Sequence, residues 1–150
     1  MNWFSKKVYE QLVKTRHINI SPHFKLYEID CRDGAPVPFF CLKKYALKLI
    51  PHLETIRALY NEPMIVNSWY RTERYNTLVG GVKTSWHKKA AACDFWFVNH
   101  SSNEVYNDIL KLINEGKIPN GGLGLYDGFV HYDTEDTGER WDKRKNKEIA

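Results

Sequence analysis

Three potential metal ligands that lie far apart in the sequence constrain the fold more than any other feature. His87 follows a glycine turn, Asp94 follows His87 into an apolar segment, and His131 lies well downstream. A neutral imidazole and a carboxylate both bind borderline divalent ions such as zinc, and a catalytic zinc site usually takes three protein ligands and keeps one position for water. The chain must therefore fold so that two distant segments meet at one cation.

Apolar residues at helical spacing predict three helices. The first spans residues 4–14, and the second spans 39–60 with an interruption at Pro51, because a proline in a helix interior removes a hydrogen bond and clashes with the preceding turn. The third begins at Ser101 or Ser102 and ends near Gly116.

Short apolar runs between chain breakers predict the strands. Residues 64–69 and 92–98 are typical of strands, and residues 122–126 and 129–133 flank an Asp127-Gly128 turn that favours a β-hairpin. We expect a small α+β fold with helices packed on a mainly antiparallel sheet, and the metal ligands at one edge of that sheet.

The residues around the three ligands form short motifs in a fixed order. These motifs are Ser68-Trp69-Tyr70-Arg71, Tyr75-Asn76, Val79-Gly80-Gly81, the run from Ser85 through His87 to Asp94, and Phe129-Val130-His131-Tyr132-Asp133. Together they resemble the zinc D-Ala-D-Ala carboxypeptidase family, which includes murein endopeptidases and phage L-alanyl-D-glutamate endolysins, and the phage-type branch resembles them most. The resemblance extends from about His23 to Trp141.

One residue departs from the pattern of this family. Ala90 stands where the family usually has glycine, and an alanine would be strained there if the backbone needs a positive φ.

The resemblance implies a hedgehog/DD-peptidase-like fold and a zinc metallopeptidase. Such an enzyme would use a Zn²⁺-activated water to hydrolyse peptide bonds of bacterial peptidoglycan, as a D,D-carboxypeptidase or an endopeptidase. The alternative is an inactive zinc-binding module, like the signalling domain of hedgehog proteins. Gly128 favours the alternative, because many family members carry an acidic residue three positions before the last histidine.

The resemblance also implies roles for individual residues. His87, Asp94 and His131 would bind the metal, and Arg71 would bind substrate and stabilise the negative charge that develops on the scissile carbonyl. Asp133 or Asp127 would act as the general base, although Asp133 could instead orient His131. The expected substrate-binding residues besides Arg71 are Ser85 and Trp141.

Composition sets the remaining expectations. A chain of 150 residues with a net charge of +4 fits a single domain over 1–150, with an N-terminal helix extension over 1–20 and a basic tail over 142–150. We expect this tail to be a solvated terminus rather than a nucleic-acid site. The family resemblance implies that the partner is a peptidoglycan peptide, and we expect the protein to be a monomer.

Two absences in the sequence bear on where the protein acts. No apolar run is long enough to cross a bilayer, so no membrane insertion is expected, and the first residues lack the apolar core of a signal peptide. We therefore expect synthesis in the cytoplasm and a separate export or phage-lysis route to the cell wall.

The cysteines do not predict a further metal site. Cys31, Cys41 and Cys93 show no paired metal spacing, and their odd number argues against a disulfide framework. On a strand, the side chain of Cys93 would point away from that of Asp94 and into the core.

Overall fold

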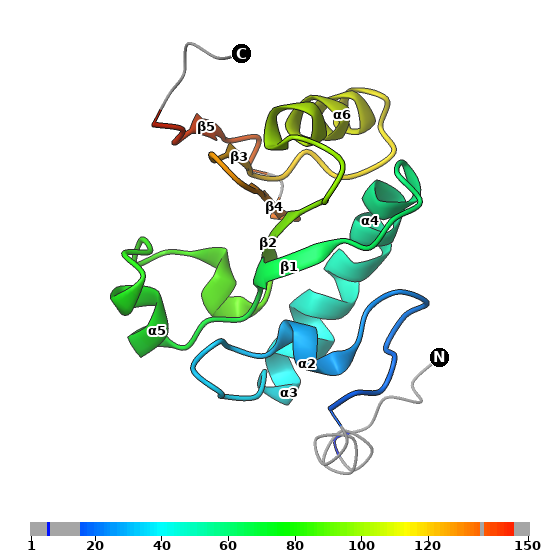
Figure 1. Ribbon diagram of the computed structural model, residues 1–150. Coiled ribbons are helices and arrows are strands. Elements are labelled where there is room, and N and C mark those ends of the chain that lie inside the picture. Colours follow the sequence, from blue (N-terminus) through cyan, green and yellow to red (C-terminus); the bar gives the residue numbers. More distant parts are fainter. Residues whose placement is uncertain (1–5, 7–15, 136, 146–150) are drawn as a thin grey trace.

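The computed structural model describes residues 6, 16–135 and 137–145, and it contains one five-stranded sheet with helices packed against it (Figure 1). The α+β class and the mainly antiparallel sheet are therefore confirmed. The helical elements are α2 (Leu26–Ile29), α3 (Phe39–Cys41), the π-helical η1 (Leu42–Ala46), α4 (Leu47–Ala58), α5 (Glu73–Leu78), the 3₁₀-helical η2 (Trp86–Lys89) and α6 (Ser102–Asn114). The strands are β1 (Ile65–Ser68), β2 (Ala92–Trp96), β3 (Leu123–Leu125), β4 (Val130–Asp133) and β5 (Arg140–Asp142).

The strands lie in the order β1-β2-β4-β3-β5, and all neighbours are antiparallel except the parallel pair β3 and β5. Their register aligns one residue from each strand in a single row across the sheet. The row consists of Ser68, Asp94, His131, Gly124 and Trp141. Because directly paired residues point to the same side of a sheet, this row defines one face, which we call the site face.

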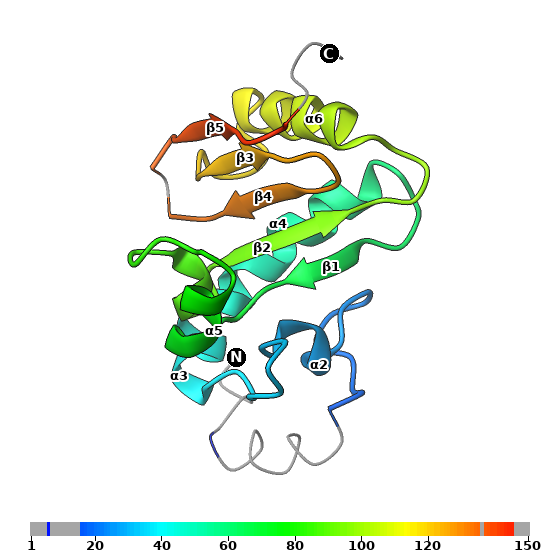
Figure 2. The ribbon, with the colours of Figure 1, turned by 60° about the vertical axis from the view of Figure 1, so that its left-hand side comes forward.

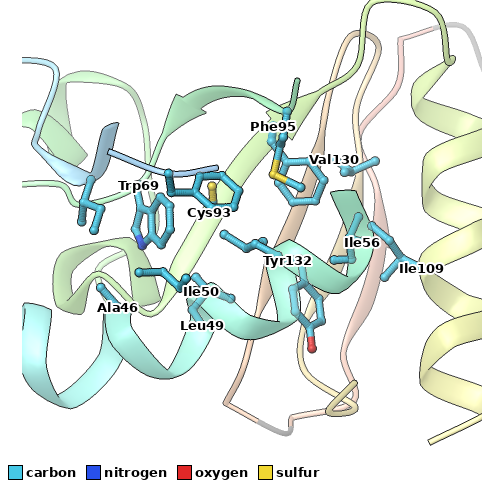
Figure 3. Packing of buried hydrophobic residues seen from close by; sticks show 14 of the residues in the cluster. Ala46, Leu49, Ile50, Ile56, Trp69, Cys93, Phe95, Ile109, Val130 and Tyr132 are labelled. Atoms are coloured by element: carbon cyan, nitrogen blue, oxygen red, sulfur yellow. The ribbon is translucent and has the colours of Figure 1, made fainter. Parts of the chain in front are cut away.

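The opposite face of the sheet carries the core. Residues that alternate with the row, such as Cys93, Phe95 and Tyr132, are buried there together with Ile56 of α4 and Ile109 of α6 (Figure 3). In Figure 2, α4 passes behind β2, and α6 lies over the other end of the sheet. The prediction that Cys93 points into the core is confirmed, and this leaves the site face to polar side chains.

The helix is not interrupted at Pro51, where the sequence predicted a break. Helix α4 continues through Pro51, and the irregular part is the π-helical turn Leu42–Ala46 that comes before it. The hydrogen bond that Pro51 cannot make is the one to the carbonyl oxygen of Leu47, the first residue of α4, so the loss falls in the first turn of that helix.

Three other expectations can be compared with the described residues. The hairpin is confirmed, since β3 and β4 pair across the turn that contains Asp127 and Gly128. The expectation of a site at the sheet edge is wrong, because β2 and β4 are inner strands. The helix expected over 4–14 lies, apart from residue 6, outside the described residues. None of the described helices is long and apolar enough to span a membrane.

Candidate metal centre

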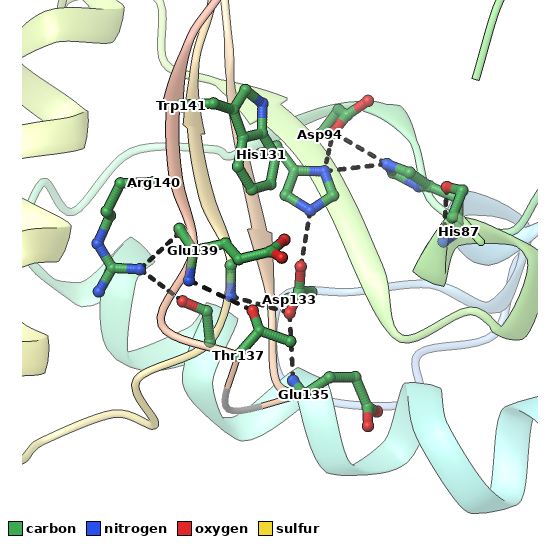
Figure 4. Close-up of polar contacts among 12 residues, drawn as sticks. His87, Asp94, His131, Asp133, Glu135, Thr137, Glu139, Arg140 and Trp141 are labelled. Atoms are coloured by element: carbon green, nitrogen blue, oxygen red, sulfur yellow. Dashed lines mark hydrogen bonds and ion pairs between the residues drawn. The ribbon is translucent and has the colours of Figure 1, made fainter. Parts of the chain in front are cut away.

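The three predicted ligands converge on the site face (Figure 4). His87 Nε2 and His131 Nδ1 each lie 3.0 Å from Asp94 Oδ1, and the two nitrogens are 3.2 Å apart. The residues are only 2% to 8% exposed. Among the described residues, these three form the one group of histidine, cysteine and acidic side chains arranged to hold a metal ion.

Each imidazole is fixed by an acceptor on its other nitrogen. His87 Nδ1 donates to the carbonyl oxygen of Trp69 at 2.7 Å, and His131 Nε2 donates to Asp133 Oδ2 at 2.9 Å. Both acceptors lack a proton to give, so each ring must carry its hydrogen on the nitrogen that faces away from Asp94. The neutral rings therefore turn lone pairs toward the carboxylate, as ligands with fixed partners do in metal sites.

Three acceptor atoms at these separations repel one another unless a positive charge lies among them. A tetrahedral zinc ion with bonds of 2.0–2.1 Å would separate its ligand atoms by about 3.3 Å. The observed separations of 3.0 to 3.2 Å are within a few tenths of an ångström of that value. Two imidazoles and one carboxylate, with no fourth protein ligand in the described cluster, are the donor set of a catalytic rather than a structural zinc site.

The electrostatics of the cluster agree with a site built for a cation. Burial opposes charge on His131, but the hydrogen bonds to Asp133 and Asp94 outweigh it and raise the pKa of His131 to about 9. Burial would raise the pKa of Asp94, yet the neighbouring His87 and His131 hold it below its usual range. Burial lowers the pKa of His87. A proton on His131 therefore occupies the position that a metal ion would take.

Arg71 holds the second oxygen of the ligand carboxylate. Its Nη2 donates to Asp94 Oδ2 at 2.9 Å, and its Nε donates to Ser68 Oγ at 2.9 Å. Nη1 lies 3.4 Å from Asn76 Oδ1, and Asn76 Nδ2 donates to the carbonyl oxygen of Val82. Asp94 Oδ1 is thus the oxygen that faces the two histidines, while the remaining N–H groups of Arg71 have no acceptor among the described residues.

Asp133 is fully engaged as an acceptor. Besides accepting from His131, it accepts at Oδ1 from the backbone N–H of Gly122 at 3.0 Å and of Glu135 at 3.2 Å. A Cβ on Gly122 would lie 2.3 Å from Asp133 Oδ2, so this close backbone approach requires glycine. Burial raises the pKa of Asp133, but the hydrogen bond from His131 and that from Gly122 more than offset it and leave the pKa lowered.

His87 is presented by a short turn with a strained end. Ser85 caps the 3₁₀ helix η2 by accepting the N–H of His87 at its hydroxyl oxygen. The turn ends at Ala90, whose φ of 62° lies in the left-handed region. The strain expected at this position from the sequence is therefore present, and the fully buried Ala90 is held there by its surroundings.

Trp141 lies over the site because β3 has no side chain beneath it. A Cβ on Gly124 would lie 2.2 Å from Trp141 Nε1. The indole packs on the ring of His131, with centroids 4.9 Å apart, and its Nε1–H donates to the hydroxyl oxygen of Tyr126 at 3.0 Å. The motifs did not indicate Tyr126, although its period-two spacing from Gly124 would have placed it on the site face.

The other candidate base lies in the hairpin turn. Asp127 is exposed, and its Oδ2 accepts from the backbone N–H of Lys145 at 3.1 Å. No hydrogen bond or ion pair within the described part of the chain links it to the three ligands. Gly128 beside it has open space where a Cβ would stand.

A comparison with protein-family models gives one match. The model described as Peptidase M15 matches residues 22–133, a range that contains all three ligands. No curated protein matches the sequence.

Proposed function

Since this chain belongs to the peptidase M15 family, we propose that it is a zinc-dependent peptidase that hydrolyses stem peptides or cross-links of bacterial peptidoglycan. Peptidases of this family depend on zinc, and the chain keeps a donor set suited to that ion. The observation that carries the proposal is the convergence of His87, Asp94 and His131 with both imidazole tautomers fixed.

The three ligands would hold zinc, and the ion when bound supplies a Lewis acid and acidifies water to a pKa near 7. Arg71 has two tasks in this proposal. It binds Oδ2 of Asp94, so that only Oδ1 faces the two histidines. Its N–H groups without an acceptor among the described residues stabilise negative charge on the scissile carbonyl. The Ser85 hydroxyl, which accepts the His87 N–H, still has its own proton to donate to the substrate.

The two candidate bases differ in their surroundings. Asp133 makes three accepted hydrogen bonds and has a lowered pKa, which favours orienting His131 over taking up a proton. The exposed Asp127 in the turn beside Tyr126 has an oxygen free of hydrogen bonds among the described residues, and it is the proposed proton acceptor.

A second candidate function is an inactive zinc-binding module. It is favoured by Gly128, which offers no acid at the position where many family members have one, and by the complete engagement of Asp133. In this case the protein would bind zinc and cleave no wall peptide.

Digestion of purified muropeptides followed by mass spectrometry separates the two functions. The zinc-loaded protein should release D-alanine if it is a D,D-carboxypeptidase, or separate cross-linked peptides if it is an endopeptidase. A chelator should stop the reaction, and added zinc should restore it.

His87→Ala should abolish both zinc binding and cleavage, while His52→Ala, on α4 and outside the metal cluster, should leave both intact. Zinc binding without cleavage of any muropeptide by the wild-type protein would establish the module and refute the peptidase.

A further inference from the structure

Tyr126 lies on the site face close to the metal ligands. Gly124 pairs directly with His131, and Tyr126 follows two residues later. The hairpin pairing extends to this position, since the Tyr126 N–H donates to the carbonyl oxygen of Phe129 at 3.1 Å. Because side chains alternate along a strand, Tyr126 points to the same side as His131.

Tyr126 is held at its ring, at its hydroxyl group and at its backbone. It stacks on Phe129 with centroids 4.4 Å apart and an interplanar angle of 10°. Its backbone carbonyl oxygen accepts from Ser102 Oγ at 2.7 Å, and its hydroxyl oxygen accepts from Trp141 Nε1. The phenol is therefore a preorganised group, which costs little to place when a ligand binds.

The direction of the Trp141 hydrogen bond leaves the Tyr126 proton available. An indole N–H only donates, so the phenol oxygen is the acceptor, and its own O–H has no acceptor among the described residues. The Trp141 indole that donates to the Tyr126 hydroxyl oxygen also packs on the ring of His131, so the phenol lies one side chain away from a candidate ligand. Burial raises the pKa of Tyr126 by more than the hydrogen bond from Trp141 lowers it, so the phenol stays protonated at neutral pH.

We propose that Tyr126 is a catalytic residue whose O–H donates a hydrogen bond to the scissile carbonyl oxygen as that oxygen gains negative charge, alongside Arg71. The inference rests on the peptidase function proposed above. Trp141 is then a positioning residue, and Gly124 is the position that admits its indole. No covalent step is involved, and Tyr126 keeps its proton throughout.

The test compares Tyr126→Phe with Tyr106→Phe, which removes a hydroxyl on α6 away from the site face. Loss of one donor to a developing oxyanion lowers kcat by about 10²–10³-fold. Tyr126→Phe should therefore lower kcat by at least about tenfold with KM and zinc affinity unchanged, and Tyr106→Phe should behave as wild type.

Trp141→Phe keeps a ring over His131 but removes the N–H, so it should lower kcat by a smaller factor. If the two residues act as a unit, the double variant Tyr126→Phe with Trp141→Phe should be no worse than Tyr126→Phe alone. An unchanged kcat in Tyr126→Phe, or a zinc affinity that falls in step with kcat, would overturn the proposal.

A binding measurement keeps this test separate from the peptidase function. A phosphinate dipeptide, whose tetrahedral anion resembles the attacked carbonyl, should bind the zinc-loaded Tyr126→Phe variant more weakly than the wild type by at least about tenfold. An uncleaved D-Ala-D-Ala amide analogue should bind both equally. If the wild-type protein cleaves no muropeptide, the proposed peptidase function fails, and the phosphinate measurement alone decides whether Tyr126 donates to a tetrahedral anion. Equal phosphinate affinities of the wild type and Tyr126→Phe would refute that role of Tyr126.

Discussion

Replacing Asp133 with asparagine should weaken zinc binding by reversing one hydrogen bond. In the wild-type protein, Asp133 Oδ2 accepts from His131 Nε2, while Oδ1 accepts from the N–H groups of Gly122 and Glu135. Asparagine keeps an oxygen for the two backbone donors, so its amide nitrogen must face His131. That nitrogen donates, and His131 Nε2 must then accept.

The consequence is a change of tautomer at the ligand atom. With Nε2 accepting, the ring hydrogen moves to His131 Nδ1, the nitrogen that lies 3.0 Å from Asp94 Oδ1. Turning the amide over would avoid this, but it would leave the buried N–H of Gly122 facing an NH₂ group, at a cost of about 1–3 kcal/mol, and the half-buried N–H of Glu135 would lose its acceptor as well. Loss of such a ligand-orienting partner typically lowers metal affinity by 10–100-fold, or about 1.4–2.8 kcal/mol.

Competition with a chromophoric chelator measures the zinc Kd of Asp133→Asn. Glu135→Gln is the matched control, because it removes the same charge from the same loop while the Glu135 N–H that donates to Asp133 remains. At saturating zinc, Asp133→Asn should regain most of the wild-type activity if Asp133 positions His131 and is not the base. A zinc Kd within twofold of wild type would show that Asp133 does not set the tautomer of His131.

Four further predictions concern pH and the backbone. Because the pKa of His131 is about 9 without metal, zinc binding at pH 7 should release about one proton, and affinity should rise about tenfold per pH unit toward 9. Calorimetry in buffers of different ionisation enthalpy counts the released protons. Zinc binding without proton release would contradict the raised pKa of His131. In the metal-free protein, the raised pKa of His131 adds to the free energy of unfolding. This contribution is fully present below pH 6.5 and is lost as the pH rises through about 9. Gly81→Ala places a Cβ 2.1 Å from Asn76 Oδ1 and should cost about 1–3 kcal/mol in urea unfolding, whereas Gly128→Ala, with open space around it, should be nearly neutral. Equal effects would refute the packing argument. Ala90→Gly relieves about 1–2 kcal/mol of left-handed strain but loses a buried methyl worth about 0.8 kcal/mol and adds about 0.5–1 kcal/mol of chain entropy, so its unfolding free energy should stay within about 1 kcal/mol of wild type. A loss above about 2 kcal/mol would show that the packing of that methyl dominates.

The sequence identified the three residues that converge at the candidate metal centre, because side-chain types that suit a cation can be recognised one residue at a time. The types and spacing of His87, Asp94 and His131 were enough to indicate a common cation, and the hairpin around Asp127 followed from its turn residues. The same kind of pattern placed Cys93 on the core side of its strand. The branch of the family and the bond that is cut do not follow from such patterns.

The sequence could not show which partner each side chain would take. Asp133 was a candidate base by its position after His131, and only the loop geometry around Gly122 revealed that both its oxygens are occupied. Tyr126 was missed because its role depends on an indole from β5, and the parallel pairing of β3 with β5 is a long-range contact.

What the sequence determined by itself was a set of donor atoms and the alternating pattern that puts them on one side of their strands. What only the tertiary structure decided was the strand order, which sets Ser68, Asp94, His131, Gly124 and Trp141 in one row across all the strands of the sheet. Periodicity is a property of neighbouring residues, but register between strands depends on how the whole chain buries its apolar surface. For that reason the ligands could be read from the sequence, while the groups that orient them could not.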